Sequence, residues 1–231
     1  LFKRWFIDFE FPNEDGKPYK SSGGKMVESE LGEIPEGWEV GAISSIVDHS
    51  KDALKPLEKS KKVFSHYSIP AYDDGYFPVE ESGESILSNK FLVKKYSFLV
   101  SKLNPSFPRI WAIGDVDESA SICSTEFQVL VPVGKGKYSY LFCFLKSASF
   151  TKEMTSRATG TSSSHQRVRP DDMLSIGMAM PVVDVLIKYD NSVKKLLQKI
   201  NHNIAELQTL TKVRDSLLPK LMSGQIRVKD L

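Results

Sequence analysis

The end of the chain carries an apolar repeat that a lone globular domain cannot use. After Pro181 the apolar residues recur in steps of four and three, the 3.5-residue period typical of a coiled-coil seam. The positions of the repeat are Val193, Leu197, Ile200, Ile204, Leu207, Leu210 and Leu217. The three-residue step to Leu210 shifts the phase and would overwind a supercoil locally without ending it. We therefore expect one long amphipathic helix from Asp184 to Leu218 that packs on another helix.

The length of this helix bears on the choice between two interpretations. An ordinary amphipathic helix folds back on its own domain. At about 1.5 Å per residue this one would reach roughly 50 Å, longer than a small domain, which favours a partner helix. The opposite face carries basic residues that would face solvent or an anionic partner: Lys194, Lys195, Lys199, Lys212 and Arg214. Pro219 is expected to stop the helix.

Composition permits a globular fold but does not indicate which class of molecule the chain binds. With 231 residues, 41% of them hydrophobic, the chain could form one large domain or two small ones. It has 31 basic and 29 acidic residues, so its net charge of +2 neither indicates nor excludes nucleic acid. Cys123 and Cys143 lie in apolar runs without zinc or redox spacing and are interpreted as buried hydrophobes. Without a membrane span or a signal peptide pattern, the protein is expected to be soluble and cytoplasmic.

Three parts are expected along the chain. Residues 1–24 hold aromatic residues at helical spacing, like the end of a preceding helix, and then a linker or mobile loop rich in Gly, Pro and Ser. Residues 25–181 contain short β-branched and aromatic runs between turn dipeptides, which predicts a mainly β domain. One of these runs, YSYLFCFL at 138–145, fits strand or helix. Residues 182–231 hold the long helix and a tail. The predicted fold class is α+β, a mainly β domain followed by one coiled-coil-forming helix.

Enzymatic motifs are incomplete. The tetrapeptide from Asn104 to Phe107 resembles the Asn-Pro-Pro-Phe loop of amino-methyltransferases, but Ser106 replaces the second proline. Those enzymes also need a Gly-rich loop after a first strand, whereas the segment from Gly134 to Lys137 is a charged turn between two β-like runs. The sequence shows no phosphate loop, nucleophile elbow or metal-ligand spacing. We expect no catalytic residue, metal or cofactor in this chain.

Two polar clusters remain, at 101–111 and 157–169. Their hydroxyl, amide and guanidinium groups are those that contact phosphates and base edges in DNA. A flexible Ser-rich loop flanked by solvated arginines is the alternative. The candidate DNA-binding residues are Lys102, Asn104, Arg109, Arg157, Thr161, Ser164, His165, Gln166 and Arg167.

Five motifs, in order, resemble the specificity subunit of type I restriction-modification systems. They are LGEIPEGWEV, SKLNP followed by RIW, STEFQVLVP, TGTSSSHQRV and LTKVRDSLLPKLMSGQIRV. Members of this family carry two target-recognition domains, separated and followed by long helices that pair antiparallel. This chain has one such domain and one such helix, and it begins at Leu1 with a segment resembling the end of the preceding helix. It looks like the C-terminal half of a subunit, or a natural half subunit that pairs with its own copy.

The resemblance implies a mechanism without catalysis by this chain. The domain would read one half of a divided DNA target, and the helix would set the distance to the other half. Two methyltransferase subunits, which bind S-adenosylmethionine and methylate adenine, and a motor-nuclease subunit for restriction would be its protein partners. The residues do not indicate which DNA sequence is the target.

Within the family, SKLNP and STEF recur among members with different targets. Lys102, Asn104 and Arg109 are therefore assigned to the scaffold or to the DNA backbone, whereas Ser164, His165, Gln166 and Arg167 are expected to contact DNA. Segments such as 66–76 would read bases. The alternatives are the recognition portion of a self-sufficient adenine methyltransferase or nuclease, and a purely structural dimerisation protein.

Overall fold

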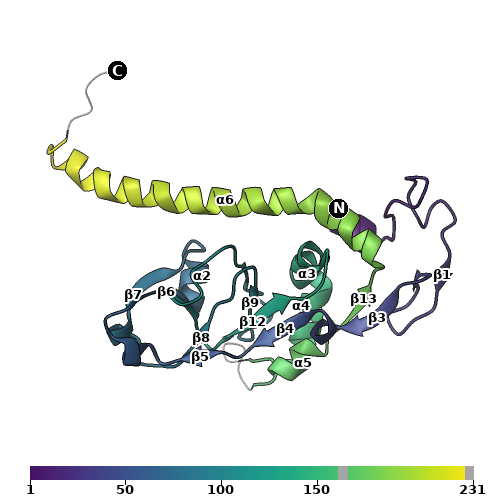
Figure 1. The fold of residues 1–231 in the computed structure, drawn as a ribbon, viewed down its shortest axis with the longest axis horizontal. Coiled ribbons are helices and arrows are strands. Elements are labelled where there is room, and N and C mark those ends of the chain that lie inside the picture. Colours follow the sequence, from purple (N-terminus) through teal and green to yellow (C-terminus); the bar gives the residue numbers. More distant parts are fainter. Residues whose placement is uncertain (161–165, 227–231) are drawn as a thin grey trace. The chain divides into compact units, whose positions relative to one another are not determined.

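The computed structural model describes residues 1–160 and 166–226 and divides the chain into two units (Figure 1). The first unit, Leu1–Val193, is a β-rich domain with short helices, and the second begins at Lys194 within the long helix α6 (Val183–Met222). This architecture confirms the predicted fold class. In the part of the chain that the structure describes, no helix is both long and apolar enough to cross a membrane.

Two sheets form the centre of the first unit. The four-stranded sheet is antiparallel throughout, whereas the five-stranded sheet contains one parallel pair, β11 with β6. In spatial order the first sheet consists of β10 (Ile110–Ala112), β9 (Phe98–Ser101), β12 (Phe127–Pro132) and β4 (Val47–Ser50). The second consists of β5 (Ala53–Leu54), β8 (Lys90–Leu92), β11 (Ser121–Cys123), β6 (Val63–Tyr67) and β7 (Val79–Ser82). Two smaller antiparallel pairs are β1 (Met26–Val27) with β2 (Ile34–Pro35), and β3 (Glu39–Ala42) with β13 (Gly177–Met180).

The main core cluster joins residues of both sheets. Trp111 of β10 is 4% exposed and contacts Tyr67 of β6 with 4.8 Å between ring centroids. Leu99, Phe127 and Val129 of the four-stranded sheet are fully buried in the same cluster. Cys123 belongs to it as well and is fully buried as expected, whereas Cys143, also expected to be buried, is only half-buried. Burying these apolar side chains holds the two sheets together.

Helices pack around the sheets. Phe98 of β9 lies 4.7 Å from Tyr138 and 5.7 Å from Phe142 of α3 (Lys137–Leu145), measured between ring centroids. The run at 138–145, which the sequence left open between strand and helix, is helical. Its apolar residues pack on several sides, which removes the periodicity that separates helix from strand. The helices before α6 are α1 (Phe2–Phe6), α2 (Ile69–Asp73), α3 (Lys137–Leu145), α4 (Ala148–Ser156) and α5 (Pro170–Leu174), with short 3-10 turns at Ile43–Ser45, Pro56–Lys59 and Gly83–Ser85.

The first unit extends beyond the predicted domain of 25–181 at both ends. Phe6 of α1 is 4% exposed, and its ring centroid lies 4.6 Å from that of Tyr140 and 4.8 Å from that of Tyr189 in α6. Phe11 stacks on Tyr19 at 4.6 Å between ring centroids, so part of the predicted linker is folded against the unit. Aromatic contacts of this kind add to the burial of the rings themselves. Residues 1–24 therefore belong to the compact unit.

Two expectations for the long helix need correction. Helix α6 continues through Pro219 to Met222, so the predicted stop at Pro219 was wrong. The missing N–H of a proline in the last turn leaves one carbonyl unpaired, which water can satisfy at an exposed helix end. Val193 was predicted to pair with another helix, but it is 7% exposed and belongs to the compact unit. The later positions Ile200, Leu207, Leu210 and Leu217 are 40–58% exposed.

Gly136 offers a test of the packing between α3 and the start of α6. It precedes α3 with φ of 73°, and a Cβ there would lie 2.8 Å from the Leu186 carbonyl carbon. Gly16 has φ of 74° with nothing within 4 Å of such a Cβ, which makes it a matched control. We expect Gly16→Ala to lower the free energy of unfolding by about 1–2 kcal/mol, the cost of a left-handed backbone. Gly136→Ala should lower the free energy of unfolding by about 1–3 kcal/mol more than Gly16→Ala does, because the added methyl group also overpacks the contact with Leu186. Equal losses in urea denaturation would contradict the close approach.

Candidate nucleic-acid interface

Three segments that are distant in sequence meet at the end of β9. The Lys102 amide donates to the Glu126 carbonyl over 2.9 Å, and the Lys102 carbonyl accepts from the Val168 amide over 3.0 Å. The Asn104 amide donates to the Gln166 carbonyl over 2.9 Å. The SKLNP, STEF and TGTSSSHQRV motifs are therefore adjacent, although the sequence separates them. We refer to this arrangement of 101–104, 124–128 and 157–160 with 166–168 as the three-segment site.

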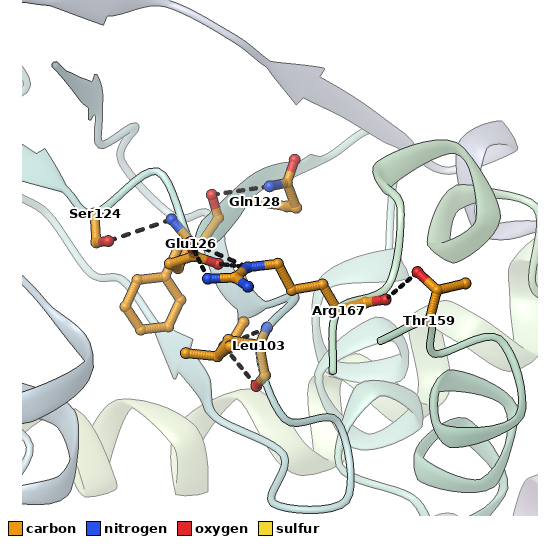
Figure 2. Close-up of polar contacts among 8 residues, drawn as sticks. Leu103, Ser124, Glu126, Gln128, Thr159 and Arg167 are labelled. Carbon is orange, nitrogen blue, oxygen red and sulfur yellow. Dashed lines mark hydrogen bonds and ion pairs between the residues drawn. The ribbon is translucent and has the colours of Figure 1, made fainter. Parts of the chain in front are cut away.

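Arg167 joins the third segment to the second. Its backbone exchanges two hydrogen bonds of 2.9 Å with Thr159, which places these two residues side by side. Its Nε lies 3.1 Å from a carboxylate oxygen of Glu126, and Figure 2 shows the guanidinium against that carboxylate. The Arg167 side chain is 45% exposed and that of Glu126 is 26% exposed. The ion pair is thus accessible to solvent and to a ligand.

The loop after Asn104 is fixed at both ends. Asn104 adopts a left-handed conformation with φ of 49°, and its carbonyl accepts from the Phe107 amide over 2.9 Å. Arg109 forms a two-pronged ion pair with Asp73, with both N–O distances at 2.8 Å. Two parallel hydrogen bonds of this kind fix orientation as well as distance. The Arg109 side chain is 17% exposed, which fits its assignment to the scaffold.

The other predicted DNA-binding residues are distributed as follows. Arg157 follows α4 and forms an ion pair with Glu153 one helical turn earlier. Gln166 is half-buried and contributes its carbonyl to the site. Thr161, Ser164 and His165 lie outside the described residues. The three-segment site therefore contains Lys102, Asn104, Arg157, Gln166 and Arg167, and Arg109 lies outside it, at the end of the loop that follows Asn104.

Sequence reasoning missed the carboxylates that hold the basic residues. Glu126 pairs with Arg167, Asp73 pairs with Arg109, and Glu153 pairs with Arg157. Only the last pair has a sequence signal, because residues four apart face each other on a helix. The other two pairs join residues 41 and 36 positions apart, and no local pattern indicates such contacts.

The segment 66–76, predicted to contact bases, has several side chains bound to the protein. Tyr76 donates its hydroxyl to the Ile110 carbonyl over 2.5 Å and lies 5.1 Å from Trp111 between ring centroids. His66 pairs with Glu81 through Nδ1, and burial lowers the pKa of His66 although that carboxylate opposes the shift. The exposed residues of this segment are Pro70 and those from Asp73 to Gly75.

The chain is similar in sequence to specificity subunits of type I restriction enzymes. No family model matches the chain. The type I restriction enzyme MjaIX specificity subunit of Methanocaldococcus jannaschii is 25% identical over 261 residues, which cover 100% of this chain and 52% of that protein. The HindI specificity subunit of Haemophilus influenzae is 24% identical over 201 residues, covering 84% of this chain and 42% of that protein. The chain spans about half the length of the curated relatives it matches.

A solved structure has the same fold. The crystal structure of the HsdS subunit from Thermoanaerobacter tengcongensis matches this chain with a TM-score of 0.59 and 17% identity. The match covers 89% of this chain and 54% of the HsdS chain. As in sequence, the match covers about half of the longer protein.

The ion pair of Arg109 and Asp73 offers a test of the scaffold assignment. Hydrogen bonding to the Arg109 guanidinium lowers the pKa of Asp73. The stability from this pair is therefore complete above the unfolded-state pKa, near 4, and is lost as the pH falls through the lower folded-state pKa. Because Asp73 is partly exposed, we expect Asp73→Asn to cost only about 1 kcal/mol at pH 7. The difference from wild type should shrink below about pH 4 in denaturation experiments. A difference independent of pH would contradict the ion pair as its source.

Proposed function

We propose that this chain, which is similar in sequence and fold to about half of a type I restriction enzyme specificity subunit, recognises one half of a divided DNA target. The observation that carries the proposal is the three-segment site, where Lys102, Gln166 and Arg167 lie on adjacent segments. Guanidinium and ammonium groups contact phosphates, and amides and arginines read base edges. The MjaIX specificity subunit matches across the whole of this chain, and the HindI specificity subunit across 84% of it.

We further propose that the chain performs no catalysis of its own. The adenine methylation would come from methyltransferase subunits that bind S-adenosylmethionine, and cleavage from a motor-nuclease subunit. The relatives support this division, because they are specificity subunits. The alternative of a self-sufficient methyltransferase or nuclease has no such support from the comparisons.

The exposed part of α6 would act as the spacer between two half-sites. From Lys194 to Met222 the helix extends about 44 Å at 1.5 Å per residue. Its apolar positions beyond Val193 would pack on an equivalent helix, in a second copy or in a longer polypeptide. The register of that pairing would set the separation of the half-sites.

The direct test of the proposed function is to map adenine methylation by a complex reconstituted from this chain and its methyltransferase subunit. We expect methylation within one divided motif. A symmetric motif would indicate two identical halves, and an asymmetric motif a longer parent subunit. Calorimetry should detect S-adenosylmethionine binding to the methyltransferase subunit and none to this chain alone. Methylation without sequence preference would overturn the proposal.

Paired variants of Arg167 and Glu126 test the DNA contact. If Arg167 binds a phosphate, Arg167→Ala should weaken DNA binding by about tenfold and reduce the salt dependence by about one counterion. Glu126→Gln should then strengthen binding, because it removes a negative charge that competes for the guanidinium. If Arg167 only braces the loop, both variants should weaken binding.

Arg4→Ala is the control for these measurements, since Arg4 is exposed on α1 and lies outside the three-segment site. Fluorescence anisotropy over a range of salt concentrations separates the outcomes. Unchanged affinity in Arg167→Ala would remove Arg167 from the interface.

The helix pairing is tested by placing charge on the predicted seam. Leu207 and Leu210 are 55% and 58% exposed, so replacing both with Asp should leave the compact unit intact. An unpaired buried carboxylate costs several kcal/mol, and we therefore expect pairing to weaken by about a hundredfold or more. Analytical ultracentrifugation measures this. Lys212→Asp on the opposite face is the control, and equal effects of the two changes would contradict the seam.

A further inference from the structure

The loop from Asn104 to Arg109 presents an aromatic ring at its tip. Phe107 is 72% exposed, and its neighbours Ser106 and Pro108 are exposed as well. A single exposed apolar side chain is common on protein surfaces and needs no function. Phe107 differs from such a residue in how its loop is held and in what lies beside it.

The loop is stiff. Pro105 is buried, and both prolines line a small crevice of about 10 Å³ together with Phe150 and Met154 of α4. The turn from Asn104 to Phe107 is closed by a backbone hydrogen bond of 2.9 Å. After the tip, the ion pair of Arg109 with Asp73 holds the returning strand. Proline fixes φ on both sides of the ring, so little conformational entropy remains to be lost when the ring binds.

The tip is one turn from the three-segment site. The Asn104 amide that begins the turn is bonded to the Gln166 carbonyl, so the loop emerges beside the loop that carries Arg167. The segments 101–111 and 157–169 together contain Lys102, Arg109, Arg157, Arg167 and Arg169 and no acidic residue. Carboxylates from other segments pair with Arg109, Arg157 and Arg167. A rigid aromatic ring beside basic groups, of which the Arg167 side chain is 45% exposed, fits a polyanion with apolar faces between its charges. The bases of duplex DNA, enclosed by phosphates, have this chemistry.

We propose that Phe107 is an apolar wedge that inserts at a base step of the DNA beside the half-site. This inference rests on the proposed function and deepens it. Phe and Pro are side chains that proteins insert between base pairs, and the bend that results brings more protein surface to the DNA. Unstacking costs least at pyrimidine–purine steps. Phe107 would then contribute to target choice through the ease of opening one step, without a hydrogen bond to a base.

The experiment uses the complex with the methyltransferase subunit and duplexes carrying the mapped target, with 2-aminopurine at successive positions. Wild type should raise 2-aminopurine fluorescence at one step on binding, and Phe107→Ala should abolish that rise. Its affinity should fall about ten- to a hundredfold, the range for losing a stacked aromatic side chain. The salt dependence should stay at the wild-type value because no phosphate contact is removed. Phe107→Trp should retain both binding and fluorescence.

Leu87→Ala is the matched control, because Leu87 is 81% exposed and lies outside the three segments. Wild-type affinity and fluorescence in Phe107→Ala would overturn the wedge while leaving the proposed function intact. Loss of assembly with the methyltransferase subunit at unchanged DNA affinity would instead assign Phe107 to a protein contact, and would also overturn it. Equal binding of target and random DNA by the wild-type complex would point to failure of the proposed function itself.

Discussion

The candidate interface depends on the backbone of Lys102, whose amide and carbonyl both bond to other segments. These two hydrogen bonds fix the loop before β12 and the strand-like end of the loop after α4 against the end of β9. Because backbone groups make the connection, the side chains around it can change without altering the geometry. In the proposed function, this separation would keep the frame constant while the side chains that contact DNA vary. The Phe107 tip and the Arg167 ion pair both project from this frame.

The charges of the site are held by partners within the protein. Arg167 pairs with Glu126, and Arg109 pairs with Asp73, so the positive groups are oriented before any ligand arrives. The two pairs differ in their accessibility, since the Arg109 side chain is 17% exposed and that of Arg167 is 45% exposed. A phosphate could compete with Glu126 for an exposed guanidinium, whereas Arg109 is shielded by the fold. In the proposed mechanism Arg109 therefore braces the loop and Arg167 exchanges one anion for another.

The long helix has two roles that meet at Val193. Up to that residue α6 packs within the compact unit, where Tyr189 contacts the aromatic rings of Trp5 and Phe6. Beyond it, apolar side chains of the repeat are exposed, with Leu210 at 58%. An exposed apolar seam is costly in water unless it is covered. The same helix that completes the domain would therefore carry the surface through which two halves of a recognition subunit are joined.

The sequence by itself determined the long helix, the β-rich domain and the basic and polar composition of the candidate segments, because these depend on local periodicity and residue type. The run at 138–145 stayed open between strand and helix because apolar residues fill most of it and leave no clear period. The expected stop at Pro219 was wrong because an exposed last turn tolerates proline. Only the tertiary structure decided that Lys102, Glu126 and Val168 are neighbours, that Arg167 faces Glu126, and that Phe6 packs on Tyr189. These contacts join residues far apart along the chain, and the free energy that selects them comes from burial and hydrogen bonding of the whole domain.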